Sequence, residues 1–103
     1  LEDVHEQFHR LDRMLTQLRL AGVLGRAVGL LLGQFTHTSA ADPAHPFHDL
    51  EAVWASVLAD LRCPVVSGFP YGHVPRKVTL PWGVPVRVDG RRQTLSLLEA
   101  PVV

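Results

Sequence analysis

Apolar side chains recur every three to four positions near the start of the chain. The repeat occupies Phe8, Leu11, Leu15, Leu18 and Ala21. This spacing places the apolar side chains on one face of an α-helix, with polar residues on the opposite face. Gly22 and Gly25 follow, and glycine commonly ends a helix because it adopts a left-handed backbone without steric cost. The pattern predicts an amphipathic helix over residues 8–21.

A second helical repeat lies in the middle of the sequence. Its apolar positions are Leu50, Val53, Trp54, Val57, Leu58 and Leu61. Asp49 and Glu51 stand at its start, where the positive end of the helix dipole favours carboxylates. Between the two helical repeats, the stretch Thr36–Pro46 is rich in turn formers and holds two prolines, so it is expected to be a surface loop.

Short continuous apolar runs indicate strands in the remaining sequence. Ala27–Phe35 has the length and composition of a central strand that is covered on both faces. Cys63–Phe69 is expected to form another short buried strand, with Cys63 as a small core residue. This strand ends at Pro70 and a turn over residues 71–73.

Three further strands are expected near the C-terminus, at Lys77–Leu80, Val84–Val88 and Thr94–Leu98. An Asp-Gly pair at positions 89–90 favours a β-hairpin between the last two, with a loop that two arginines lengthen. The order of elements is a strand end, a helix, a strand, a helix, a strand and three short strands. Because strands that alternate with helices pair in parallel, the predicted fold class is α/β: a mostly parallel sheet with two helices and a small C-terminal β meander.

The composition fits one globular domain over residues 1–103. Apolar residues make up 47% of the chain and charged residues 19%, so burial of apolar side chains can offset the entropy of ordering. Ten basic and ten acidic residues cancel, which leaves no strong field to attract nucleic acid or an anionic membrane. The longest apolar run, Ala27–Leu32, is far shorter than the ~20 residues that cross a bilayer.

The beginning of the sequence and its single cysteine add two expectations. Leu-Glu-Asp is neither a methionine start nor a leader, so we expect the reading frame to begin well upstream and the chain to be a piece of a larger protein. One cysteine excludes an internal disulfide and fits a reducing compartment.

The segment His5-Glu6-Gln7-Phe8-His9 matches the H-E-x-x-H pattern of zinc peptidases. On a helix, two histidines four positions apart share a face and could bind zinc, with Glu6 polarising a bound water. A catalytic zinc needs a third protein ligand, and the first acidic residue placed to return is Glu51. The histidines next in sequence are His37, His45 and His48, all near the predicted loop. Basic residues at positions 10 and 13 also disfavour a cation site, so we expect surface histidines and no bound metal.

Five segments taken together resemble one known family. They are Leu1–Val4, Arg10–Gly22, Val28–Phe35, Pro64–His73 and Thr79–Gly83. Their most specific motifs are the LED start, the R-x-D-R-M-L-x-Q-L helix and the G-x-P-x-G-H turn. In order and spacing, the segments resemble the C-terminal domain of LD-carboxypeptidases, also called muramoyltetrapeptide carboxypeptidases, over nearly all 103 residues.

The resemblance implies a swivelling β/β/α fold and a cytoplasmic bacterial serine peptidase with a Ser-His-Glu triad. By motif position the glutamate is Glu2 and the histidine is His73, while the serine lies on an N-terminal domain outside this chain. The implied full-length enzyme releases the terminal D-alanine of muropeptide tetrapeptides in cell-wall recycling and needs no cofactor. Its implied partners are the muropeptide and the N-terminal domain, and a homodimer is left open.

Two departures from the family's pattern fall in the zinc-like segment. Relatives usually carry glycine where this chain has His5 and tyrosine where it has His9, so the H-E-x-x-H match is expected to be drift. Phe8-His9-Arg10 replaces the commoner Pro-Tyr-Arg, which puts in doubt any substrate contact made by that tyrosine.

The chemistry of such a triad explains the residue types. Serine is a weak nucleophile, so it needs an imidazole that accepts its proton and returns it to the leaving amine; His73, in a turn after a buried strand, fits that role. A carboxylate on the other ring nitrogen holds the tautomer and stabilises the imidazolium. Glu2 ranks first as that carboxylate because strand alternation turns Asp3 to the opposite face. Asp3 and Glu6 remain close competitors.

Three other functions stay open at this point. A microcin-immunity type peptidase of the same fold would cleave a peptide-nucleotide antibiotic. A zinc peptidase would use His5, Glu6 and His9, and a non-enzymatic interaction or dimerisation module would need no serine-bearing domain. The chain's own serines are Ser39, Ser56, Ser67 and Ser96. None lies in the glycine-flanked elbow that exposes a nucleophile, so the isolated chain is expected to be inactive.

Overall fold

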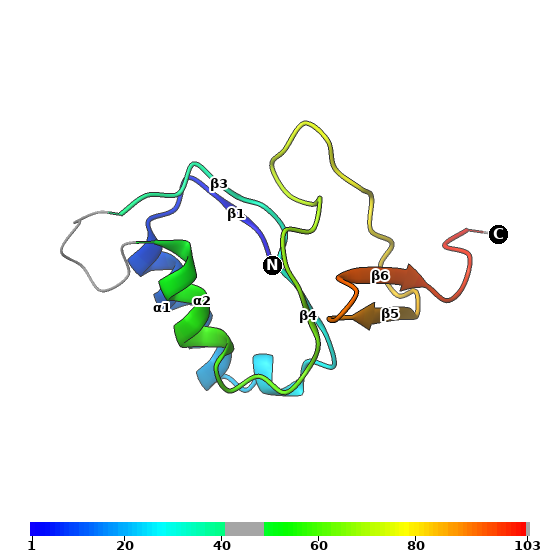
Figure 1. The fold of residues 1–103 in the computed structure, drawn as a ribbon, viewed down its shortest axis with the longest axis horizontal. Helices are drawn as coiled ribbons and strands as arrows, with labels where there is room; N and C mark the ends of the chain where they lie inside the picture. Colours follow the sequence, from blue (N-terminus) through cyan, green and yellow to red (C-terminus); the bar gives the residue numbers. More distant parts are fainter. Residues whose placement is uncertain (41–48, 103) are drawn as a thin grey trace. The chain divides into compact units, whose positions relative to one another are not determined.

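The computed structural model of the protein describes residues 1–40 and 49–102. In these residues, two α-helices, one short 3₁₀ helix and six short strands follow one another (Figure 1). In chain order they are β1 (Asp3–Val4), α1 (Phe8–Leu20), η1 (Leu24–Arg26), β2 (Leu30–Leu31), β3 (Phe35–Thr36), α2 (Leu50–Leu58), β4 (Val65–Val66), β5 (Val86–Asp89) and β6 (Thr94–Leu97).

The chain divides into two compact units, each of which is described by itself. The helical unit consists of Asp3–Ala27 and Phe35–Arg62. The strand unit consists of Leu1–Glu2, Val28–Gln34 and Cys63–Val103. Two parallel strand pairs, one antiparallel hairpin and two helices give the α/β fold class that the sequence predicts.

The helical unit is held together by the apolar faces of its two helices, which lie against each other (Figure 1). Its buried core residues are Leu11, Leu15, Leu24, Val53 and Val57. β1 pairs in parallel with β3, in a register that sets Asp3 opposite Phe35. The ring of Phe35 then meets Trp54 of α2 edge to face, with ring centroids 4.9 Å apart. The helical repeats in the sequence therefore predict this core correctly.

The ends of the two helices follow from local chemistry. After α1, Gly22 adopts a φ of +72°, and Val23 N–H donates to the Leu18 carbonyl, as in a glycine-ended helix. At the start of α2, Oδ1 of Asp49 accepts a hydrogen bond from Ala52 N–H at 2.7 Å, so Asp49 is the N-cap. α2 ends at Leu58, three residues before the predicted end, and the chain turns through a Leu61 N–H to Leu58 carbonyl bond.

In the strand unit, the segment Leu30–Gln34 is paired on both edges. β2 lies parallel to β4, and Leu32 N–H donates to the Val66 carbonyl. The strand predicted at Ala27–Phe35 is confirmed only in part, since β2 covers Leu30–Leu31 and Phe35 belongs to β3. Its first residues differ from the prediction, because Val28 is 92% exposed. The preceding 3₁₀ helix, whose Leu24 carbonyl accepts a hydrogen bond from Ala27 N–H at 3.2 Å, delays the start of the strand.

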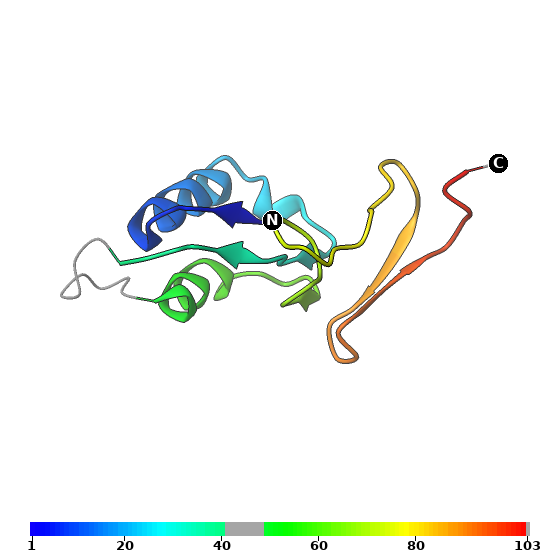
Figure 2. The ribbon, with the colours of Figure 1, turned by 90° about the horizontal axis from the view of Figure 1, so that it is seen from above.

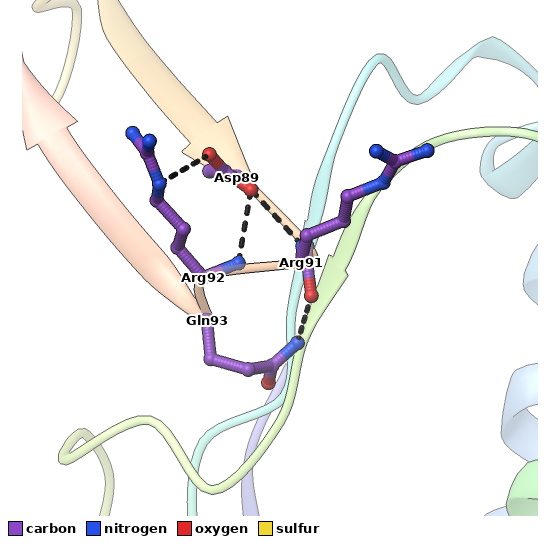
Figure 3. Close-up of polar contacts among 5 residues, drawn as sticks. Asp89, Arg91, Arg92 and Gln93 are labelled. Carbon is purple, nitrogen blue, oxygen red and sulfur yellow. Dashed lines mark hydrogen bonds and ion pairs between the residues drawn. The ribbon is translucent and has the colours of Figure 1, made fainter.

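The C-terminal hairpin forms as predicted, with β5 antiparallel to β6 (Figure 2). In its loop, Oδ1 of Asp89 accepts hydrogen bonds from the backbone N–H groups of Arg91 and Arg92, each at 3.0 Å (Figure 3). The first strand of the predicted meander is wrong: the described chain has no strand at Lys77–Leu80. Prolines at positions 75 and 81, which donate no ladder hydrogen bond, flank that stretch.

Two smaller expectations also need correction. Cys63 is a free thiol that is only partly buried, so it is not a core residue. The predicted loop begins later than expected, since Thr36 belongs to β3 and Ser39 pairs with Gln7 in an isolated parallel bridge. Its later part, residues 41–46, and His45 and His48 lie outside the described residues. Neither described helix has the length and apolar character needed to cross a membrane.

Candidate active site

Two side chains of the strand unit meet beside the turn that follows β4. The Nδ1 atom of His73 lies 3.0 Å from the Oε2 atom of Glu2. Because a carboxylate oxygen only accepts, this hydrogen bond needs a proton on Nδ1 and leaves Nε2 of a neutral imidazole as an acceptor. The His73 side chain is 62% exposed and that of Glu2 is 25% exposed. The imidazole is therefore held by the carboxylate and open to an approaching group.

The backbone brings these two residues together through the segment that lies between them. Gly33 N–H donates to the Leu1 carbonyl at 2.8 Å, next to Glu2. The following N–H, that of Gln34, donates to the Tyr71 carbonyl at 2.8 Å. Successive N–H groups of an extended strand point to opposite edges. Leu1, next to Glu2, and Tyr71, two residues before His73, are therefore bound to opposite edges of one strand.

Two glycines permit this close approach. A Cβ atom at Gly33 would lie 2.6 Å from the Tyr71 carbonyl oxygen, well inside contact distance. A Cβ atom at Gly72 would lie 2.9 Å from Oε2 of Glu2 and 3.1 Å from the Gln34 carbonyl oxygen. Gly72 also has a φ of +120°, a backbone conformation that residues with a Cβ atom rarely adopt. A larger residue at either position would displace the backbone or the carboxylate that contacts His73.

A hollow of about 350 Å³ adjoins the pair. It is lined by Glu2, Tyr71, Gly72, His73, Lys77, Val78, Thr79 and Leu80. Lys77 supplies a cation to this lining, and an ammonium group in the same hollow as the imidazole suits a ligand that carries a carboxylate. Sequence reasoning missed Lys77 because it placed the residue in a strand of the meander.

A second, mostly apolar pocket of about 310 Å³ shares Tyr71 and Leu80 with this hollow. Trp82 lines it and is 96% exposed. The sequence analysis used Trp82 only as part of a motif. The sequence could have indicated Trp82 as a surface residue, because a tryptophan between proline and glycine stands outside any predicted apolar repeat.

The other candidate carboxylates have different neighbours. Oε2 of Glu6 lies 3.3 Å from a guanidinium nitrogen of Arg10, one helical turn along. Oδ1 of Asp3 accepts a hydrogen bond from the backbone N–H of Val4 at 2.7 Å. Glu2 is thus the one of the three that contacts His73, as the ranking of the carboxylates expects.

The zinc-like segment does not have the geometry of an H-E-x-x-H helix. The N-cap of α1 is Gln7, so His5 and Glu6 precede the helix and only His9 lies on it. His5 has a φ of +61°, and its ring stacks on that of His37 with centroids 4.8 Å apart. His5 and His9 therefore do not share a helix face. Within 1–40 and 49–102, no three His, Cys, Asp or Glu residues are grouped as a metal site would need.

The serines of the chain are not among the residues that line the hollow. Ser67 donates its backbone N–H to Oε1 of Gln93 at 2.9 Å. No serine lines the hollow beside His73 in the part of the chain that the structure describes. The hydroxyl groups in this lining are those of Tyr71 and Thr79.

Comparison with known proteins places the sequence among carboxypeptidases. The family model of the LD-carboxypeptidase C-terminal domain matches residues 1–88. A protein of Synechocystis sp. that is named as a carboxypeptidase is 41% identical over 99 residues, which make up 95% of this chain and 32% of the relative. The chain thus spans about a third of that relative's length.

Solved structures agree with this placement. The crystal structure of muramoyltetrapeptide carboxypeptidase from Oxalobacter formigenes is 38% identical, with a TM-score of 0.70, over 82% of this chain and 30% of that one. The microcin C7 self-immunity protein, known from Escherichia coli, has a TM-score of 0.81 over 99% of this chain and 30% of its own. At 24% identity, the second likeness is one of fold.

Proposed function

Because the chain belongs to the family of LD-carboxypeptidase C-terminal domains, we propose that it supplies the histidine and the glutamate of a Ser-His-Glu triad in a longer serine carboxypeptidase. The observation that carries this proposal is the 3.0 Å contact between Nδ1 of His73 and Oε2 of Glu2. The serine belongs to an N-terminal domain of the same protein, and the isolated chain is inactive.

In this proposal His73 acts as the general base. Its Nε2 atom accepts the proton of the serine hydroxyl as the oxygen attacks the scissile carbonyl, and later returns that proton to the leaving amine. Glu2 accepts the hydrogen bond from Nδ1, fixes the tautomer and stabilises the imidazolium that forms. Water then hydrolyses the acyl-enzyme by the same exchange of protons. No metal or cofactor takes part.

The proposed substrate is a muropeptide tetrapeptide that loses its terminal D-alanine. The name of the Oxalobacter relative, a muramoyltetrapeptide carboxypeptidase, supports this choice. Lys77 in the wall of the hollow supports it independently, since the C-terminal carboxylate of such a substrate would find an ammonium group close to His73. Such an enzyme would serve cell-wall recycling in the bacterial cytoplasm.

A microcin-immunity type peptidase is the second candidate, supported by the 26% sequence identity with the microcin C7 self-immunity protein of Escherichia coli over 96% of this chain. The two functions differ in product. A cell-wall enzyme releases free D-alanine from a tetrapeptide, whereas the alternative cleaves a peptide joined to a nucleotide. Assay of the full-length protein on both substrates separates them.

The direct test is His73→Ala in the full-length protein. D-alanine release should fall to the level of a sample without enzyme, because the serine loses its base, while circular dichroism and the unfolding midpoint stay unchanged. His9→Ala, a histidine of the helical unit, is the matched control and should retain activity. Full activity of the His73→Ala protein would refute the proposed triad. Loss of activity in both variants, with zinc bound to the active protein, would favour the metal-dependent alternative.

A further inference from the structure

We propose that Gln34 is a positioning residue that holds the turn bearing His73 at the distance from which the imidazole reaches Glu2. Its catalytic consequence rests on the proposed function, whereas its effect on the His73–Glu2 contact does not. The proposal concerns the side-chain amide of Gln34, which touches neither member of the pair.

The amide of Gln34 binds the start of the turn. Its Nε2 atom donates to the carbonyl oxygen of Gly68 at 2.9 Å and to that of Phe69 at 3.2 Å. Its backbone N–H donates to the carbonyl oxygen of Tyr71 at 2.8 Å. One residue thus binds three carbonyls of the segment 68–71, which leads directly into Gly72 and His73.

The turn is closed by one longer bond, from Val78 N–H to the Pro70 carbonyl at 2.8 Å, and Phe69 N–H donates to the Leu32 carbonyl of the neighbouring strand at 2.9 Å. The short-range bonds of the turn are Tyr71 N–H to the Phe69 carbonyl and Val74 N–H to the Gly72 carbonyl, each spanning only two residues. Gly68, at a φ of +64°, reverses the chain at its start. Bonds that close so few residues fix a local bend and not its position. The bonds to the neighbouring strand, which include two from the Gln34 amide, therefore help to fix where the turn lies.

The same strand also fixes Glu2. The residue before Gln34 donates its N–H to the Leu1 carbonyl, and the Gln34 carbonyl lies against Gly72. The strand at Gln34 is therefore bonded to the segments that carry Glu2 and His73. If the Gln34 side chain releases the carbonyls of Gly68 and Phe69, the turn can move while Glu2 stays in place.

Gln93 offers a matched comparison in the same unit. Its Nε2 atom also donates to two carbonyls: that of Val65 at 3.0 Å, and that of Gly90 at 2.6 Å, a bond that Figure 3 shows. Its Oε1 atom accepts from Ser67 N–H at 2.9 Å. It thereby fastens the hairpin loop to β4. These contacts involve neither the Phe69–Tyr71 segment nor Glu2. A change at Gln93 should cost stability without moving His73.

The test compares Gln34→Glu with Gln93→Glu in the 103-residue chain. Each variant replaces an amide N–H₂ by a carboxylate oxygen that faces two carbonyl oxygens, so both should lower the urea midpoint. The imidazole ¹⁵N chemical shifts of His73, recorded at alkaline pH, report how much of the neutral ring carries its proton on Nδ1. We expect the wild type and Gln93→Glu to keep the Nδ1–H form, and Gln34→Glu to shift toward a mixture of tautomers.

Gln34→Met covers the case in which Gln34→Glu does not fold, because it removes the donor and adds no charge. In the full-length protein, the Gln34 variants should lower kcat about 10- to 100-fold with little change in KM, as expected for a displaced base. A His73 tautomer that stays as in the wild type in the folded Gln34 variants would overturn the inference. A tautomer shift with unchanged kcat would confirm the positioning role and count against the proposed triad instead.

Discussion

The imidazole of His73 and the carboxylate of Glu2 are joined by a hydrogen bond of 3.0 Å, although one residue opens the chain and the other lies 71 positions later. The contact fixes which ring nitrogen carries the proton. It also orients the free nitrogen, because the ring rotates little while Nδ1 is bound.

Glu2→Gln should keep the shape of the side chain and remove its charge. Without the carboxylate, the tautomer with the proton on Nδ1 loses its preference and the imidazolium loses its counter-charge, so kcat of the full-length protein should fall about 10³- to 10⁴-fold. Glu6→Gln, whose parent carboxylate pairs with Arg10, should leave kcat within about twofold. Equal losses in the two variants would mean that Glu2 has no special role.

Gly72→Ala should separate Glu2 from His73. The added methyl group would overlap Oε2 of Glu2 and sit at a φ of +120°, so the free energy of unfolding should fall by about 2–4 kcal/mol. Gly68→Ala is the control, since its φ is +64° and nothing lies within 4 Å of its Cβ. It should cost about 1–2 kcal/mol. Urea unfolding measures both losses, and a smaller loss for Gly72→Ala would contradict the packing described.

Gly33→Ala should disrupt the strand that supports the site. Its Cβ would lie 2.6 Å from the carbonyl oxygen of Tyr71, and a backbone neighbour cannot rotate away, so a loss of about 1–3 kcal/mol is expected. Gly25→Ala, with open space around its Cβ, should change the stability by less than about 0.5 kcal/mol. Thermal unfolding of the two proteins provides the measurement. Similar midpoints would show that the turn can yield to the methyl group.

Lys77→Met should weaken substrate binding in the full-length protein. Loss of the ammonium group from the hollow should raise KM about tenfold, which corresponds to roughly 1.4 kcal/mol, and alter kcat less. Arg76→Met is the control, because Arg76 does not line the hollow beside His73. A substrate whose terminal carboxylate is amidated should bind the wild type and Lys77→Met equally. An unchanged KM for Lys77→Met would remove Lys77 from the proposed site.

The sequence predicts the helical unit better than the strand unit, for a physical reason. The apolar positions of both helices repeat every three to four residues over more than two turns, so the buried face can be recognised without knowing its partner. The strands are two to four residues long, and their limits depend on hydrogen bonds to distant segments. Lys77–Leu80 has the composition of a strand and two flanking prolines, and it pairs with nothing in the described chain as a strand.

The candidate site was predictable only through family resemblance. Glu2 and His73 are ordinary residue types, and no spacing rule joins them across the sequence. Two features bring them together. Gly33 and Gly72 leave room for neighbouring carbonyl oxygens, and the amide of Gln34 donates to backbone carbonyls. Such contacts leave no periodic pattern. The contacts of Gln34 and the place of Lys77 in the hollow therefore follow only from the folded structure.

The alternating bonds of the segment from Leu32 to Gln34 set a strict limit on chain length there. An insertion or deletion of a single residue would exchange the edges to which the N–H groups point, so the bonds to Leu1 and Tyr71 would each face the wrong neighbour. The effect of an amino acid replacement in this stretch depends on the residue introduced. An insertion or deletion of one residue would instead separate Glu2 from His73 in a single step.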